Sequence, residues 1–268
     1  MTSQIGIVLL IGLIAGVMSG MFGIGGGVII VPALIIFAGF PQTLANGTSL
    51  AALLLPVAIF AVLAYYRAKL IDIKASVMIA LGLFTGVFGG AKIALNLPAN
   101  TLMQLYGLFL LYASWRFIEP AELWQLILKK EKTDSSNTAP KSIKKPNSNV
   151  FLIIPLGIIA GLFSGLFGIG GGIIIVPVLS TFFHYNHKIA IGTSLGALLL
   201  PVGLPGVICY GLAGQFDVLS AAPVALGLLI GAIFGANITI KLPSMIIRKL
   251  YGLFLFFIAL NSIFQGWI

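Results

Sequence analysis

One block of the sequence occurs twice. The first copy, AGVMSGMFGIGGGVIIVPAL, spans Ala15–Leu34, and the second, AGLFSGLFGIGGGIIIVPVL, spans Ala160–Leu179. At this offset of 145 residues, 15 of the 20 positions are identical. The same offset aligns GTSLAALLLPV at 47–57 with GTSLGALLLPV at 192–202, and no gap is needed across about ninety residues. The chain is therefore an internal duplication, and its two halves are expected to fold alike.

Long segments of both halves are almost free of charge. The chain is 59% hydrophobic and 8% charged, whereas a soluble domain has roughly 45–50% apolar and about 25% charged residues. Too few polar side chains remain to cover a water-soluble globule, which excludes soluble enzymes, nucleic-acid-binding modules and disordered proteins. Five apolar segments occur in the first half, at about 5–22, 28–40, 48–66, 75–95 and 102–118, and again 145 residues later. They predict an all-α polytopic integral membrane protein.

A polar stretch separates the halves. Residues 119–149 are rich in Lys, Ser, Asn and Pro, as in a solvated linker. We therefore divide the chain into a first membrane repeat at 1–118, the linker at 119–149, and a second membrane repeat at 150–268. The second segment of each half is shorter than the roughly 20 residues of a full span. It is expected to form a re-entrant hairpin with the first segment, tipped by FGIGGG; alternatively, residues 41–46 extend the following helix, with a break at Gly47.

Basic residues predict the orientation of the repeats, because they collect on the cytoplasmic side of a membrane. The loop at 67–74 contains three basic residues and its equivalent at 211–218 contains none, whereas the loop at 97–100 contains none and three flank its equivalent. Equivalent loops therefore lie on opposite sides, and the repeats are inverted. With the linker in the cytoplasm, 14 of the 15 basic residues are inside, only Lys92 is outside, and both termini are outside.

Two glycine-containing motifs are candidate functional elements. FGIGGG, at 22–27 and 167–172, is not a dinucleotide-binding loop, because it lacks both the preceding strand and the later acidic residue. It is either a tight turn between helices or a broken-helix tip whose free amides bind an anion. GTSL, at 47–50 and 192–195, either caps a helix or also donates hydroxyl hydrogen bonds to a ligand.

Several kinds of chemistry are missing from the sequence. No Asp or Glu lies within a predicted span, which argues against a cation as substrate. No Ser/His/Asp or Cys/His set can be assembled, and Cys209 is the single cysteine. We therefore predict no enzyme activity, no catalytic residue, no metal site and no cofactor.

The repeated AG…SG…FGIGGG…VP block, followed by GTSL, resembles the sulfite exporter TauE/SafE family, also called the toluene-sulfonate uptake permease family. The resemblance covers both halves, including Pro32 and Pro177. It implies a multi-pass transporter of the bacterial cytoplasmic membrane. The substrates it implies are sulfur-containing anions such as sulfite, sulfonates and sulfoacetate, by either import or export.

The predicted function is a secondary transporter for small sulfur-containing anions. A carrier for another solute or an anion channel is the alternative, and a membrane enzyme or receptor is a third class. The expected partners are the lipid bilayer, the anion and a coupling ion (proton or sodium), with no nucleic acid; the oligomeric state is not readable. The predicted substrate-binding residues are Phe22, Gly25, Gly26, Gly27, Thr48, Ser49, Phe167, Gly170, Gly171, Gly172, Thr193 and Ser194.

Overall fold

The structure is a computed structural model that describes residues 2–56, 58–118, 152–241 and 244–265. These residues form twelve helices and no strand, which confirms the prediction of an all-α fold. The predicted linker at 119–149 lies outside the described residues. The helices of the first half are α1 (Thr2–Phe22), α2 (Gly27–Ala38), α3 (Gln42–Leu54), α4 (Ile59–Arg67), α5 (Ile73–Asn96) and α6 (Ala99–Ile118). Those of the second are α8 (Ile153–Phe167), α9 (Gly172–Thr181), α10 (His187–Leu199), α11 (Leu204–Leu212), α12 (Val218–Lys241) and α13 (Ser244–Gln265).

The third apolar segment of each half is broken where the sequence analysis did not place a break. Helix α3 runs from Gln42 through Gly47, so residues 42–46 do extend the helix and the predicted break at Gly47 is wrong. The chain bends by 50° between α3 and α4 and by 48° between α10 and α11. Both bends begin at a leucine before a proline, Leu55 and Leu200, with ψ of 148° and 151°. A following proline excludes the helical conformation at such a residue, which explains both breaks.

The chain divides into two compact units, and each draws on both halves. The larger one comprises the described parts of 1–102 and 148–242, and the smaller one those of 103–147 and 243–268. In the smaller unit the Ser114 hydroxyl donates to the Gly252 carbonyl at 2.7 Å. Gly107 there lies against Ala259 and Ile263, so α6 and α13 pack closely through a small residue.

The larger unit is built on two helix pairs that each join the halves. Among the described helices, α1 with α12 and α5 with α8 make the most extensive contacts. A Cβ atom at Gly16 would lie 2.4 Å from the Leu228 carbonyl oxygen, and one at Gly86 would lie 2.2 Å from that of Ile158. Glycine at every fourth position on these helices, such as Gly12, Gly16 and Gly20 of α1, thus lets the two backbones of a pair touch.

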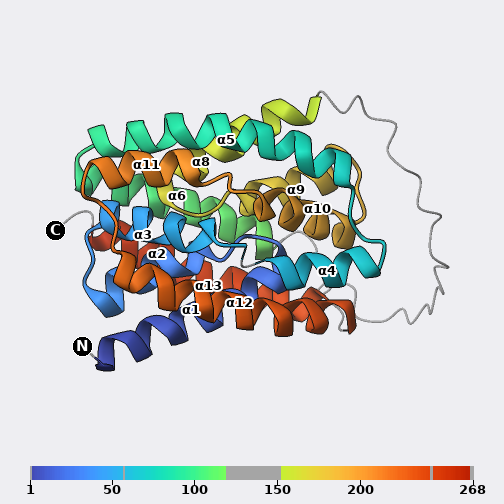
Figure 1. The fold of residues 1–268 in the computed structure, drawn as a ribbon, viewed down its shortest axis with the longest axis horizontal. Helices are drawn as coiled ribbons and strands as arrows, with labels where there is room; N and C mark the ends of the chain where they lie inside the picture. The colour runs from blue at the N-terminus through green and yellow to red at the C-terminus, as the bar shows by residue number, and fades with distance from the viewer. Residues whose placement is uncertain (1, 57, 119–151, 242–243, 266–268) are drawn as a thin grey trace, which may run out of the picture. The chain divides into compact units, whose positions relative to one another are not determined.

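The two pairs run in opposite directions. Contact positions rise together along α1 and α12, and along α5 and α8, so each pair is parallel. In Figure 1, α1 and α12 run from left to right, whereas α5 and α8 run from right to left. Since α8 is equivalent to α1, and α12 to α5, each helix runs opposite to its counterpart in the other half.

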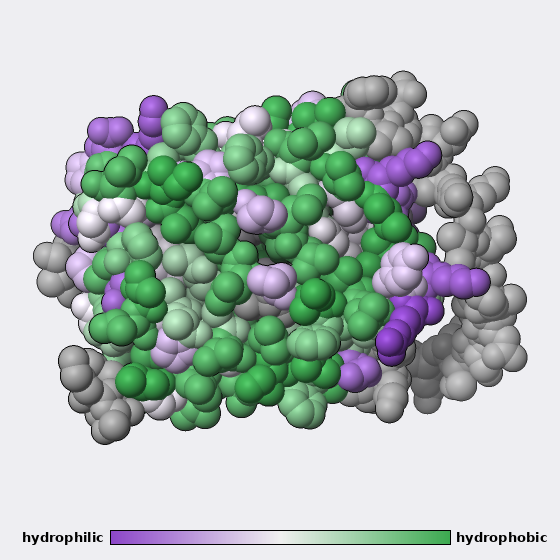
Figure 2. Space-filling model, viewed as in Figure 1, coloured by the Kyte–Doolittle hydropathy of each residue, from purple (hydrophilic) through white to green (hydrophobic). Residues whose placement is uncertain are grey.

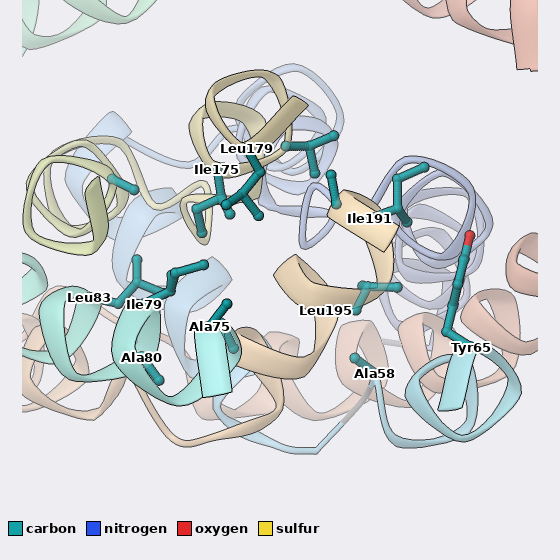
Figure 3. Packing of buried hydrophobic residues seen from close by; sticks show 14 of the residues in the cluster. Ala58, Tyr65, Ala75, Ile79, Ala80, Leu83, Ile175, Leu179, Ile191 and Leu195 are labelled. Carbon is teal, nitrogen blue, oxygen red and sulfur yellow. The ribbon is translucent and has the colours of Figure 1, made fainter. Parts of the chain in front are cut away.

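A buried apolar cluster lies inside this unit. Figure 3 shows Tyr65 of α4, Leu83 of α5, Leu179 of α9, and Ile191 and Leu195 of α10 gathered from both halves. All five side chains are inaccessible or nearly so. The cluster ties short helices of one half to long helices of the other.

The outer surface suits a lipid environment. In the view of Figure 2, hydrophobic residues cover most of the visible face, and hydrophilic ones gather toward its two ends. Within the described residues, α1, α5 and α12 are long and apolar enough to cross a membrane, and the bent pairs α3–α4 and α10–α11 also qualify if each is one span. The chain is a polytopic membrane protein.

Candidate functional site

The two FGIGGG segments form tight turns between helices. Gly23, Gly25 and Gly26 have φ values of 69°, 82° and 81°, and their equivalents in the second half have φ values within a few degrees of these. Such conformations favour glycine. The turn reverses the chain, so that Gly26 lies beside Ser19 and α2 starts back along α1. Each FGIGGG segment is therefore the tight turn at the tip of a helical hairpin, as expected for a re-entrant hairpin.

The tips of the two halves meet. A Cβ atom built on Gly25 would lie 3.7 Å from the Cα of Gly170, and one built on Gly170 would lie 3.7 Å from the Cα of Gly25. A Cβ atom on Gly27 would lie 2.4 Å from the Gly168 carbonyl oxygen, and one on Gly172 would lie 2.3 Å from that of Gly23. The backbones therefore cross at a distance that only glycine permits.

Serines of the GTSL motifs fasten each tip to the other half. The Ser49 hydroxyl donates to the Gly168 carbonyl at 2.7 Å, and the Ser194 hydroxyl donates to the Gly23 carbonyl at 2.8 Å. Ser49 and Ser194 are equivalent, as are Gly23 and Gly168, so the exchange is reciprocal. All four residues are buried.

Threonines of the same motifs bind the loops before α5 and α12. The Thr193 hydroxyl oxygen accepts from the Asp72 amide, and that of Thr48 accepts from the Asp217 amide, both at 3.0 Å. Asp72 and Asp217 lie directly before α5 and α12, outside these helices. GTSL lies in the middle of α3 and α10, so the capping interpretation is wrong. Substrate contact by the threonines and serines stays a prediction.

The remaining predicted residues surround the tips. Phe22 and Phe167 end α1 and α8, and are 4% and 2% exposed. Gly26 and Gly171 are the N-cap residues of α2 and α9. A Cβ atom on Gly26 would lie 2.7 Å from the Leu228 side chain. Close packing therefore explains why these two positions are glycine, whether or not a ligand binds there.

A cavity lies where the tips meet. Its volume is about 20 Å³, enough for about one water molecule. Most of its wall is a set of equivalent residue pairs from the two halves: Ser19 and Ser164, Gly25 and Gly170, Leu50 and Leu195, Leu53 and Leu198, and Ala58 and Gly203. A ligand larger than a water molecule would fit there only if these walls moved apart.

The cavity wall includes residues with four hydrogen-bond donors that have no acceptor among the described residues. The hydroxyls of Ser19 and Ser164 have no partner among the described residues, although these serines are only 4% and 2% exposed. The buried amides of Gly25 and Gly170 likewise have no acceptor there. Buried polar groups are normally paired, so this group of donors is suited to a ligand with several acceptor oxygens.

Ser19 and Ser164 are functional candidates that the sequence analysis missed. Both stand in the repeated SG pair, directly before Gly20 and Gly165. A signal was present: Ser19 is the only polar side chain between Ile5 and Phe22, and its equivalent is the only one between Val150 and Phe167.

A second polar group lies away from the cavity. The Tyr185 hydroxyl donates to Asp72 Oδ2 at 3.0 Å, and the Ala75 amide donates to Oδ1 at 3.1 Å. Burial, together with the negative charge of Asp72, raises the pKa of Tyr185 far above its ordinary value. Tyr185 therefore remains a neutral donor that ties the loop before α10 to the start of α5. The described residues contain no group of three or more His, Cys, Asp or Glu side chains placed to bind a metal ion.

Known proteins resemble this chain along nearly its whole length. It is 26% identical to "Probable membrane transporter protein YunE" of Bacillus subtilis over 97% of both chains. It is 28% identical to a "Probable membrane transporter protein" of Haemophilus influenzae, over 94% of this chain and 96% of that one. A protein of the same description from Methanocaldococcus jannaschii is 28% identical over 91% of this chain.

No solved structure matches the chain. The relatives carry transporter names, in keeping with a transport function. The model of the family described as "Sulfite exporter TauE/SafE" matches residues 8–262, so the chain belongs to the sulfite exporter TauE/SafE family.

Proposed function

We propose that this protein is a secondary transporter that moves small sulfur-containing anions across the bacterial cytoplasmic membrane. The observation that supports it most is the cavity between the tips, with two unpaired hydroxyls and two unpaired amides in its wall. A sulfur oxyanion presents three or four acceptor oxygens and cannot be buried without such partners. The family description names sulfite.

Helix ends supply electrostatic support for this site. The N-termini of α2 and α9 begin one residue after the N-cap glycines of the two tips. The N-terminus of a helix favours an anion through its free amides and its dipole. Broken helices present such ends to substrates in other transporters. The substrate thus lies at the junction of the two halves.

We also propose that the repeats are inverted in the bilayer, with the linker in the cytoplasm and both termini outside. The opposite direction of equivalent helices supports this orientation, as does the reversed distribution of basic residues between equivalent loops. An inverted pair of tips can expose the same cavity to either side in turn. Such alternating access is the mechanism of a carrier.

Transport into proteoliposomes tests the proposal against an anion channel. Purified full-length protein is expected to show saturable uptake of labelled sulfite, and faster uptake when the vesicles are preloaded with unlabelled sulfite. A channel would show neither saturation nor this counterflow. Absence of uptake for sulfite, sulfoacetate and other sulfonates would contradict the proposed substrate class.

A further inference from the structure

A groove opens on the surface of the larger unit between α5 and α11. The two helices touch, since a Cβ atom built on Gly206 would lie 2.7 Å from a Val87 methyl carbon, and Figure 1 shows α11 beside the C-terminal part of α5. The groove has a volume of about 400 Å³, within the roughly 300–1,000 Å³ typical of small-ligand pockets. Each helix contributes three residues to its wall: Phe84, Thr85 and Phe88 of α5, and Leu204, Pro205 and Ile208 of α11.

The wall of this groove is apolar. Both phenylalanines are exposed, as are the leucine and the isoleucine of α11. Since α5 is long and apolar enough to cross a membrane, these side chains face lipid. The one hydroxyl in the wall, that of Thr85, donates to the Gly82 carbonyl of its own helix at 2.9 Å. The groove therefore offers little to a polar ligand, whereas a hydrocarbon chain can pack along it.

A cation stands at one end of the groove. The exposed side chain of Lys92 places its ammonium nitrogen 4.4 Å from the centroid of the Phe88 ring, which is part of the wall. Helix α5 has 24 residues and is about 36 Å long, more than the roughly 30 Å of a hydrocarbon core. Lys92 lies one turn before the end of α5 at Asn96. We therefore expect it at the boundary with the lipid headgroups, with Phe88 and Phe84 one and two turns deeper.

This cation is not balanced by the protein. Within the described ranges no carboxylate forms an ion pair with Lys92. The equivalent position of α12 holds Asn237, which is neutral and whose side chain donates to the Ile233 carbonyl at 3.0 Å. The repeated fold thus does not require a lysine here, and the charge is available to an anionic group outside the protein.

We propose that the groove between α5 and α11 binds one anionic phospholipid, with an acyl chain along the apolar wall and the phosphate at Lys92. A zwitterionic lipid has the same chains but no net charge, so it lacks the Coulomb attraction. One basic residue near a membrane surface contributes about a fivefold preference for an anionic lipid. Val202 and Gly203 of the central cavity directly precede Leu204 and Pro205 of the groove, so the bound lipid contacts α11 next to the proposed transport site.

A fluorescent reporter inside the groove tests this proposal. The three tryptophans of the full-length protein are replaced by phenylalanine, and Phe84→Trp places a single indole in the wall. In proteoliposomes, quenching of this indole by lipids with brominated acyl chains gives the relative association constants at the groove. Phosphatidylglycerol is expected to associate about fivefold more tightly than phosphatidylcholine with the same chains.

Variants at lysines assign the preference to one charge. In the reporter background, Lys92→Gln should bring the ratio of the two association constants close to one, and Lys92→Arg should keep it near the original value. Lys74→Gln is the matched control, because Lys74 is also exposed on α5 but lies at its opposite end, and it should leave the ratio unchanged. Free glycerol phosphate at constant ionic strength should not alter the quenching, because it has no acyl chain.

Each outcome decides the matter. A preference for phosphatidylglycerol that Lys92→Gln removes and Lys74→Gln keeps supports the proposed site. Equal association of the two lipids, absence of quenching by either, or a preference that survives Lys92→Gln would overturn it. Displacement of the lipid by glycerol phosphate would replace the lipid with a soluble phosphate ester as the ligand. None of these results bears on the proposed transport of sulfur anions, which concerns the cavity between the tips.

Discussion

Ser19 and Ser164 are largely buried residues that line the cavity, and their hydroxyls have no hydrogen-bond partner among the described residues. A hydroxyl in that state adds little to the stability of the empty protein, because it makes no hydrogen bond within the described chain. It strengthens a complex in which a ligand oxygen completes the pair. A substitution at such a residue is expected to change ligand affinity without lowering the stability of the ligand-free protein. These residues are therefore good positions for mutation.

The double substitution Ser19→Ala with Ser164→Ala is expected to weaken sulfite binding while leaving the melting temperature of the ligand-free protein unchanged or higher. A hydrogen bond to a charged group contributes about 1.5–3 kcal/mol, so each serine accounts for about tenfold or more in the dissociation constant. Calorimetry and thermal unfolding in detergent measure the two effects, with Ser180→Ala as control. Undiminished affinity in the double variant would remove these serines from the site.

For Ser49 and Ser194 we expect the reverse pattern, in which substitution lowers the stability of the ligand-free protein. Replacing either by alanine leaves the carbonyl of Gly168 or Gly23 buried without its donor. The free energy of unfolding is expected to fall by about 1–3 kcal/mol for each residue, because an unpaired buried acceptor is costly. The loss should appear as a lower melting temperature without ligand. A variant with wild-type stability and weakened binding would instead favour direct substrate contact.

At the scale of elements, the glycines of α1 differ sharply in what surrounds them. Gly16 faces the α12 backbone, where a Cβ atom would lie 2.4 Å from the Leu228 carbonyl oxygen, whereas Gly6 has no atom within 4 Å. Gly16→Ala should therefore force α1 and α12 apart, at a cost of about 1–3 kcal/mol or more. Gly6→Ala should be neutral or slightly stabilising. Melting temperatures of both variants test this; equal values would mean that the α1–α12 contact is not tight.

Most helices could be predicted from apolar segments, and the exceptions have physical reasons. The break before Pro56 was missed because the residues on both sides are apolar, so hydropathy continues across it. The dihedral restriction before proline, however, was readable. Gly47 suggested a break, but it lies inside α3. Glycine is needed at this position because a Cβ atom there would lie 2.0 Å from the Gln215 carbonyl oxygen. A glycine placed for close approach resembles one placed for a turn when only the sequence is available.

The meeting of the two tips was predictable from the sequence, whereas the contacts around them were not. The repeated FGIGGG indicated the tips, and they do meet at Gly25 and Gly170. The partners of the GTSL hydroxyls were not readable, because Ser49 and Gly168 are 119 residues apart and belong to different halves. Similar glycine stripes on α1, α5, α8 and α12 allow several pairings, and no local pattern selects among them.

At the scale of the whole molecule, the proposed inverted orientation predicts from which side of the membrane equivalent loops are accessible. Ala68 and Ala213 are equivalent exposed residues after α4 and α11. In a Cys209→Ser background, Ala68→Cys is expected to react with an impermeant thiol reagent only from the cytoplasm, and Ala213→Cys only from outside. Labelling of intact cells and of inverted vesicles measures both. Reaction of the two cysteines from the same side would refute the inversion.

The exchange of partners between the halves also affects how the protein is made. During synthesis, α1 emerges first, yet its partner α12 is among the last helices to appear. The glycine face of α1, and that of α5 until α8 follows, must therefore wait in the membrane without a protein neighbour. A first half made alone keeps its α1–α2 and α2–α3 contacts but lacks the partners of α1 and α5, so we expect it to be a target for quality-control proteases. Co-expression of the two halves as separate polypeptides gives each the missing neighbour, so we expect the two halves to be stable together and neither to persist alone.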